Sequence, residues 1–205
     1  MDTTSNEKSD EIPEFFLEKG KNTEKKKPDK KSFGLKKKET EVELKKDETS
    51  LIDADFNRNK LFSKGINRMA DEKLEDASHI FEMVLRINPN DVDALLKLGY
   101  CRFHLEDYTE SMRAYDKVLD IDVTNADAWN LKSLVYYERK TYAKALDCAD
   151  KAIDSDPTFG MAWYNRSCYL SLENQIPESL DALVRSIEID VKNAKRAVKD
   201  KDFMN

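Results

Sequence analysis

The most constraining feature of this sequence is a pattern that recurs every 34 residues, four times in succession and without insertions. The copies begin at Arg58, Val92, Ala126 and Gly160. Large apolar residues hold the fourth position of each copy: Leu61, Leu95, Trp129 and Trp163. Small residues hold the eighth position, namely Gly65, Gly99, Ser133 and Ser167, and the twentieth, namely Ala77, Ser111, Ala145 and Ser179. A fixed period of this length predicts an array of small helical units stacked on one another.

Each copy contains two stretches of helical apolar spacing, separated by a short polar turn. In the second copy these stretches are expected over 92–105 and 108–121, with the turn at Glu106 and Asp107. Pro89 and Pro157 follow the second stretch of the first and third copies, where a proline would end the helix. Small residues at positions eight and twenty would let the two helices approach closely, while larger residues fill the surrounding space.

These columns resemble those of the tetratricopeptide repeat (TPR) family, over 136 of the 205 residues. The third copy carries the family pattern most fully: Trp129, Ser133, Tyr136, Ala145, Ala149, Ala152 and Pro157. The other copies depart from it at the eleventh position, with Arg68, Arg102 and Leu170 in place of an aromatic residue. The resemblance implies an all-α, right-handed solenoid of four helix-turn-helix repeats, 58–91, 92–125, 126–159 and 160–193, followed by a short capping helix over 194–205.

The resemblance also implies where a partner would bind, because in TPR proteins the first helix of each unit lines a concave groove. The lining positions of the family correspond here to a mostly apolar, exposed strip: Phe62, Ile66, Met69, Leu96, Tyr100, Phe103, Asn130, Leu134, Tyr137, Tyr164 and Leu172. Such a strip favours a helical or apolar peptide as ligand, and thus a non-enzymatic adaptor or scaffold that binds another protein. The alternative for any single side chain is that it packs between helices.

One specialised TPR subgroup grips the terminal carboxylate of heat-shock chaperones with lysine, arginine and asparagine side chains. The corresponding pairs in this sequence are Phe62/Ile66, Leu96/Tyr100 and Asn130/Leu134. They lack the cations that would neutralise a carboxylate, so this mode of binding is excluded.

Residues 1–57 are rich in charge and poor in apolar spacing, which predicts a disordered tail. Its middle, 19–46, has 12 lysines and 5 acidic residues. A tail of this kind could be a solvated spacer that makes no contact.

Two hypotheses give the tail a contact instead. In the first, Phe15, Phe16 and Leu17 dock into the groove of the same chain. In the second, the lysine block binds nucleic acid or ribosome while the repeats recruit a second protein, and this is the alternative to the adaptor function. The candidate residues of the second hypothesis are Lys25, Lys26, Lys27, Lys36, Lys37 and Lys38.

Composition argues against several other classes of function. A net charge of −6 disfavours bulk binding of nucleic acid. His79 and His104 lack a paired ligand at helical spacing, and the three cysteines match no zinc pattern, so no metal, cofactor or catalytic group is predicted. The sequence has no apolar run near the ~18 residues of a membrane span and no signal peptide pattern at residues 1–10, so a cytoplasmic location is expected.

Overall fold

The computed structural model describes the backbone of residues 39–203 and the side chains of residues 54–203. The helices are α2 (Glu39–Ala70), α3 (Leu74–Ile87), α4 (Val92–His104), α5 (Tyr108–Ile121), α6 (Ala126–Glu138), α7 (Tyr142–Ser155), α8 (Gly160–Leu172), α9 (Ile176–Ile189) and α10 (Lys192–Ala197), with a final 3₁₀ turn, η1 (Lys201–Phe203). No strand occurs between residues 39 and 203.

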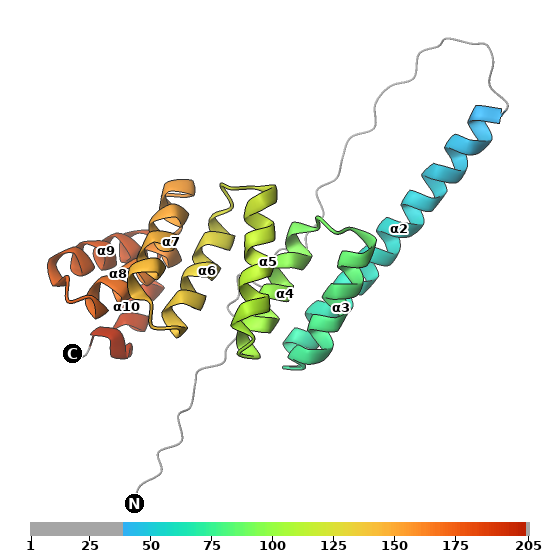
Figure 1. Cartoon of the computed structure of the whole chain (residues 1–205). Helices are drawn as coiled ribbons and strands as arrows, with labels where there is room; N and C mark the ends of the chain where they lie inside the picture. The colour runs from blue at the N-terminus through green and yellow to red at the C-terminus, as the bar shows by residue number, and fades with distance from the viewer. Residues whose placement is uncertain (1–38, 204–205) are drawn as a thin grey trace, which may run out of the picture.

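The helices form four pairs, α2–α3, α4–α5, α6–α7 and α8–α9, which follow one another along a single row (Figure 1). Each pair corresponds to one 34-residue copy, and each second helix also packs against the first helix of the next pair. The predicted all-α solenoid is therefore confirmed. The helices α3 and α7 end at Ile87 and Ser155, one residue before Asn88 and Asp156, which precede the two prolines.

The turn inside every unit has the same backbone geometry. Its central residue has positive φ, between 54° and 60°: Glu72, Glu106, Lys140 and Asn174. In the second unit, Glu106 N–H donates to the carbonyl of Phe103 (2.9 Å) and Asp107 N–H to that of Arg102 (2.8 Å). This pair of bonds is a Schellman motif, which satisfies the last carbonyls of the first helix and reverses the chain.

Close contact within the units depends on the small residues at position eight. A Cβ atom added to Gly99 would lie 2.4 Å from the ring of Tyr115, and one added to Gly65 would lie 2.8 Å from the ring of Phe81. Both rings are buried in one apolar cluster that runs from the first to the third unit. The glycines therefore make room for aromatic side chains that fill the space between the two helices of a unit.

The tryptophans at position four fix the connections between units. Trp129 donates its indole N–H to the carbonyl of Val123 (2.8 Å), and Trp163 donates to the carbonyl of Pro157 (3.0 Å). Both acceptors lie six residues before the tryptophan, in the loop that joins two units. These two hydrogen bonds thus connect the starts of α6 and α8 to the loops that precede them.

The prediction of a disordered tail ending at residue 57 is wrong for residues 39–57, which belong to α2. From Glu39 to Lys64 the sequence contains neither glycine nor proline and is rich in glutamate, lysine and leucine, which are good helix formers. Because the second half of α2 is held against α3, its first turns need no separate nucleation. Residues 1–38 lie outside the described part of the chain.

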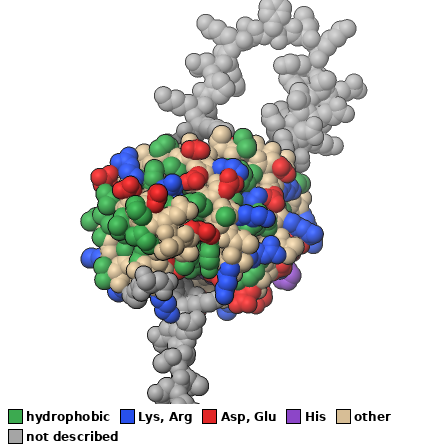
Figure 2. Space-filling model, turned by 60° about the vertical axis from the view of Figure 1, so that its left-hand side comes forward, with side chains coloured by type: hydrophobic (Ala, Val, Ile, Leu, Met, Phe, Trp, Pro, Cys, Tyr) green, Lys and Arg blue, Asp and Glu red, His purple; other side chains and the backbone are tan. Residues whose placement is uncertain are grey.

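The capping helix expected over 194–205 also differs from the structure. Instead of one helix, the chain forms the six-residue α10, which begins at Lys192, and then the turn η1. A non-helical stretch separates them and redirects the chain onto α8. The outer side of α9 keeps Ile176, Leu180 and Val184 exposed. Figure 2, which turns this end of the molecule forward, shows hydrophobic side chains gathered on it.

Candidate functional site

The first helices of successive units form one layer of the solenoid. Helix α4 contacts α6, and α6 contacts α8. We call the surface made by α2, α4, α6 and α8 the inner face. All the predicted groove residues lie on these helices, but the structure gives them two different environments.

The expectation that the whole strip is exposed is wrong for five of its members, which are buried: Met69, Leu96, Tyr100, Asn130 and Tyr164. Contacts between neighbouring first helices contribute to this burial. The side-chain amide of Asn165 on α8, for example, donates to that of Asn130 on α6 over 2.8 Å in a buried position. The remaining six are half-buried and can still touch a ligand: Phe62, Ile66, Phe103, Leu134, Tyr137 and Leu172.

Aromatic rings gather at the end of α4. The ring of His104 lies 4.2 Å from that of Tyr100 and 5.2 Å from that of Phe103. The ring of Phe103 lies 5.8 Å from that of Tyr108 on α5. His104 is therefore part of an aromatic cluster, and His79, on α3, is bonded to Glu82 instead.

An arginine connects the first two units beside this face. The guanidinium of Arg58 contacts both carboxylate oxygens of Asp91, at 2.5 and 2.7 Å. This hydrogen bond is the main reason that the pKa of Arg58 is raised. Asp91 is buried and also caps α4 by accepting from the N–H of Ala94 (3.0 Å). Arg58 lies 4.6 Å above the ring of Phe62, so the ion pair also positions one of the half-buried residues.

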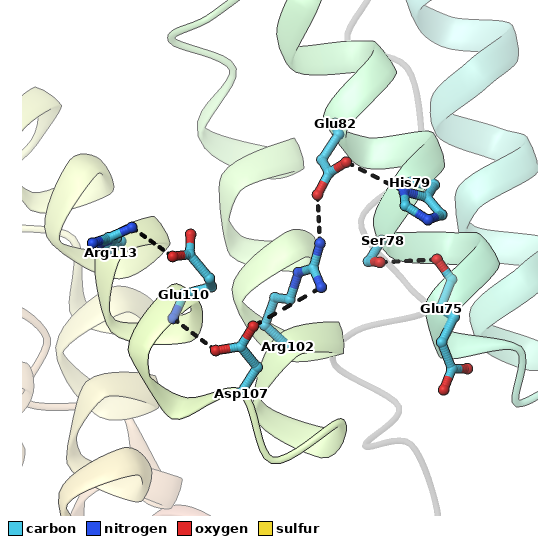
Figure 3. Close-up of polar contacts among 8 residues, drawn as sticks. All are labelled: Glu75, Ser78, His79, Glu82, Arg102, Asp107, Glu110 and Arg113. Atoms are coloured by element: carbon cyan, nitrogen blue, oxygen red, sulfur yellow. Dashed lines mark hydrogen bonds and ion pairs between the residues drawn. The ribbon is translucent and has the colours of Figure 1, made fainter.

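Ion pairs explain two departures from the TPR pattern. Arg102, where an aromatic residue is usual, reaches across units to Glu82 on α3 at 2.5 Å and lies 4.0 Å from Asp107 in its own turn (Figure 3). Glu82 also faces His79, and Arg102 and His79 oppose the effect of burial, so that the pKa of Glu82 is lowered. Arg68 makes longer contacts of the same kind with Asp71 and Asp76. At the eleventh position of the first two units, a charge pair thus takes the place of the aromatic side chain that is usual in the family.

The end of the chain occupies part of the inner face, which the sequence analysis missed. The hydroxyl of Tyr164 on α8 donates to Asp200 (2.5 Å), and that of Tyr137 on α6 donates to Asp202 (3.1 Å). The ring of Phe203 lies edge-on to that of Tyr164, with centroids 6.1 Å apart. Residues 200–203 of the same chain therefore already contact two of the predicted groove residues, Tyr137 and Tyr164. The only sequence signal is the pattern Asp-Lys-Asp-Phe at 200–203, which lies outside the repeats.

The cysteines are unpaired and buried. Burial raises the pKa of Cys101 to about 12 and that of Cys148 to about 11, and it raises that of Cys168 further. Among the described residues, the sulfur of Cys168 and carboxylate oxygens of Asp200 and Asp202 lie within 4.8 Å of one another. Both carboxylates already accept hydrogen bonds from Tyr164 and Tyr137, and we assign no metal to this group.

The tail contacts fall outside the described residues. This applies to the proposed docking residues Phe15, Phe16 and Leu17 and to the lysines Lys25, Lys26, Lys27, Lys36, Lys37 and Lys38. Among residues 39–203, nothing supports the alternative function of nucleic acid or ribosome binding. Within the described part of the chain, every helix is too short or too polar to cross a membrane.

Four stacked helix pairs, closed by the same turn and packed through small residues, define a helical-repeat solenoid. Comparison with protein families specifies it further. One tetratricopeptide repeat model matches residues 68–135, and another matches residues 126–159. The chain is a tetratricopeptide repeat protein.

Solved structures share this fold. A crystal structure of MamA superposes with a TM-score of 0.60 at 21% identity, covering 72% of this chain and 86% of that one. MamA from Desulfovibrio magneticus gives a TM-score of 0.59 at 18% identity, covering 66% and 76%. A thermophilic TPR protein of Thermus thermophilus gives 0.59 at 15% identity, covering 65% and 74%. A search of curated protein sequences finds no significant match. At these identities the likeness concerns the fold.

Proposed function

We propose that this protein is a non-enzymatic adaptor that binds a helical or apolar segment of another protein on its inner face. The observation that carries the proposal is the series of half-buried apolar side chains on successive first helices, Phe62 and Ile66 on α2, Phe103 on α4 and Leu134 on α6. Side chains of this kind can lose their remaining exposed area to a ligand without any rearrangement of the core. An amphipathic helix laid across several units would contact them in turn.

Rigid presentation supports the same function. Phe62 packs against Phe81 with ring centroids 5.5 Å apart, and Phe103 packs against His104 and Tyr108. Aromatic side chains that are already fixed lose little conformational entropy on binding, which favours them as anchors of an interface.

Affinity capture from the source cells with the full chain tests the proposal. The test variant combines Phe103→Ser with Leu134→Ser on the inner face. The matched control combines Leu180→Ser with Val184→Ser, two side chains that are 55% and 56% exposed on α9. Circular dichroism at matched concentration establishes that both variants are folded. We expect the inner-face variant to lose captured proteins that the control retains. If only the α9 variant loses them, the binding surface is the outer side of α9 and the proposal is wrong.

A further inference from the structure

The segment that follows α10 lies on the inner face rather than at the end of the solenoid. Asp200 and Asp202 accept hydrogen bonds from Tyr164 and Tyr137, as described above. Ser171, one turn beyond Cys168 on α8, donates its hydroxyl to the backbone carbonyl of Asp202 at 2.6 Å. Two side-chain contacts and one backbone contact therefore hold a stretch of four residues across two adjacent units, in the manner of a bound peptide.

The segment has its own internal order. Asp202 N–H donates to the side chain of Asp200 at 3.0 Å, which closes a tight turn and directs both carboxylates to the same side. Phe203 then places its ring against that of Tyr164. Residues 200–203 therefore have the pattern acidic, any residue, acidic, aromatic. The side chain of Lys201 is exposed, so the inner face does not select for a particular residue at this position.

The hydrogen bonds that the inner face gives to these carboxylates come from uncharged groups, the two tyrosine hydroxyls, with the Cys168 thiol a weak third donor to Asp200 at 3.8 Å. The nearby guanidinium of Arg196 lies 5.3 Å over the ring of Tyr164. Burial raises the pKa of Asp202, and Asp200 and Glu138 raise it further, against the opposing effect of Tyr137. A peptide that presents the same two carboxylates would accept the same hydrogen bonds, so it would compete with the segment for one site.

We propose that the inner face of α6 and α8 binds short peptides with two acidic residues two positions apart followed by an aromatic residue, and that residues 200–203 are an internal copy that such a peptide displaces. The inference deepens the proposed function, since it assigns a partner chemistry to the last two units. It differs from the chaperone-tail mode, because hydroxyl groups take the place of cations. Tethering gives the internal copy a high effective concentration, so an external peptide competes poorly until the copy is weakened.

The test uses the fluorescent peptide Lys-Asp-Lys-Asp-Phe, which repeats residues 199–203, and measures its binding to the full chain by fluorescence anisotropy. The first protein variant combines Asp200→Ser, Asp202→Ser and Phe203→Ser, which removes the side-chain contacts of the internal copy with Tyr164 and Tyr137. We expect it to bind the peptide at least about tenfold more tightly than the unaltered chain. The peptide Lys-Ala-Lys-Ala-Phe, which lacks the carboxylates, should bind neither protein.

The second step adds Tyr137→Phe and Tyr164→Phe to the first variant, which keeps both rings and removes only the two hydroxyls. Affinity should fall about tenfold or more, because two hydrogen bonds to carboxylates are lost. Tyr136→Phe on α6, whose side chain is half-buried among other aromatic residues, is the matched control and should leave affinity unchanged.

Three results would overturn the inference. Peptide binding that is equally tight with and without the internal copy, or that survives the loss of both hydroxyls, would place the peptide elsewhere. Absence of peptide binding to every variant, with protein capture still dependent on Phe103 and Leu134, would reject this partner chemistry while leaving the adaptor function standing. If the Phe103→Ser/Leu134→Ser variant retains all captured proteins while peptide binding still depends on the two hydroxyls, the adaptor function proposed above is wrong and the partner chemistry assigned to α6 and α8 stands.

Discussion

Gly99→Ser is the perturbation whose effect follows most directly from the packing of the units. A Cβ atom at this position would lie 2.4 Å from the ring of Tyr115, whereas ordinary contact begins at 3.4 Å, so the ring would have to move by about 1.0 Å (3.4 − 2.4). Tyr115 is 1% exposed and packs in the buried apolar cluster, so a shift of its ring would displace its neighbours. Overpacking of this kind costs about 1–3 kcal/mol, partly offset by the roughly 0.5 kcal/mol by which serine exceeds glycine in helix propensity.

The third unit indicates how the loss could be suppressed. Its equivalent positions hold Ser133 and Ala149, a serine facing a small residue, where the second unit has Gly99 facing Tyr115. Tyr115→Ala alone should destabilise by about 3–5 kcal/mol, because it empties a buried site. In the double variant the serine meets no ring. We therefore expect the double variant to be about 1–2 kcal/mol more stable than the sum of the single effects predicts.

Urea denaturation followed by circular dichroism measures all four proteins of this cycle, with thermal unfolding as a second readout. For a chain of this size, each kcal/mol corresponds to roughly 2–4 °C in melting temperature. Equal slopes of the unfolding free energy against urea are needed for the comparison. If the two substitutions are additive within about 0.5 kcal/mol, Gly99 is not matched to Tyr115 and the packing argument is refuted.

Three further predictions concern single contacts. Glu106 has a φ of 60°, which favours glycine, so Glu106→Gly should raise the free energy of unfolding by up to about 1 kcal/mol. Asn174→Gly in the equivalent turn should raise it less, because asparagine tolerates this conformation. Urea denaturation measures both variants. Arg58→Ala should destabilise by about 1–3 kcal/mol, because it leaves the buried carboxylate of Asp91 without its charged partner, and adding Asp91→Asn, which keeps the cap of α4, should recover part of the loss. Burial raises the pKa of Cys101 from 9.0 to about 12, so the unfolded thiol ionises first as the pH rises. Stability should then decline by up to about 1.4 kcal/mol per pH unit above pH 9, and Cys101→Ala should make this decline less steep in stability measurements between pH 8 and 11.

The period of the sequence was sufficient to predict the helix pairs, because each helix end is encoded locally. The expected start of α4 at Val92 and the bounds of α5 agree with the structure, and the expected end of α4 was one residue too late. The start of α2 was missed because glutamate-rich and lysine-rich helical stretches have the same composition as unordered ones. Packing against a neighbour, which composition does not reveal, distinguishes them.

The inner face was less predictable than the fold. Family positions identified the correct helices, but burial of Leu96 and Asn130 depends on how closely successive units stack, which is a property of the assembled array. The docking of Asp200 and Asp202 was missed because it depends on a change of chain direction after α10, where the 34-residue period no longer applies. Contact of a partner with the half-buried residues stays a prediction that the experiments above address.

The shared turn at Glu72, Glu106, Lys140 and Asn174 also sets how tolerant this chain is to changes in length. In each of these four turns, two successive residues after the first helix donate to carbonyls in its last turn, so the number of residues is matched to this pair of backbone hydrogen bonds. Adding or deleting one residue at such a turn would break the pair and change how the two helices of that unit meet. The four turns therefore fix the spacing of the helix pairs through the backbone, and they should tolerate an exchanged side chain better than a changed length.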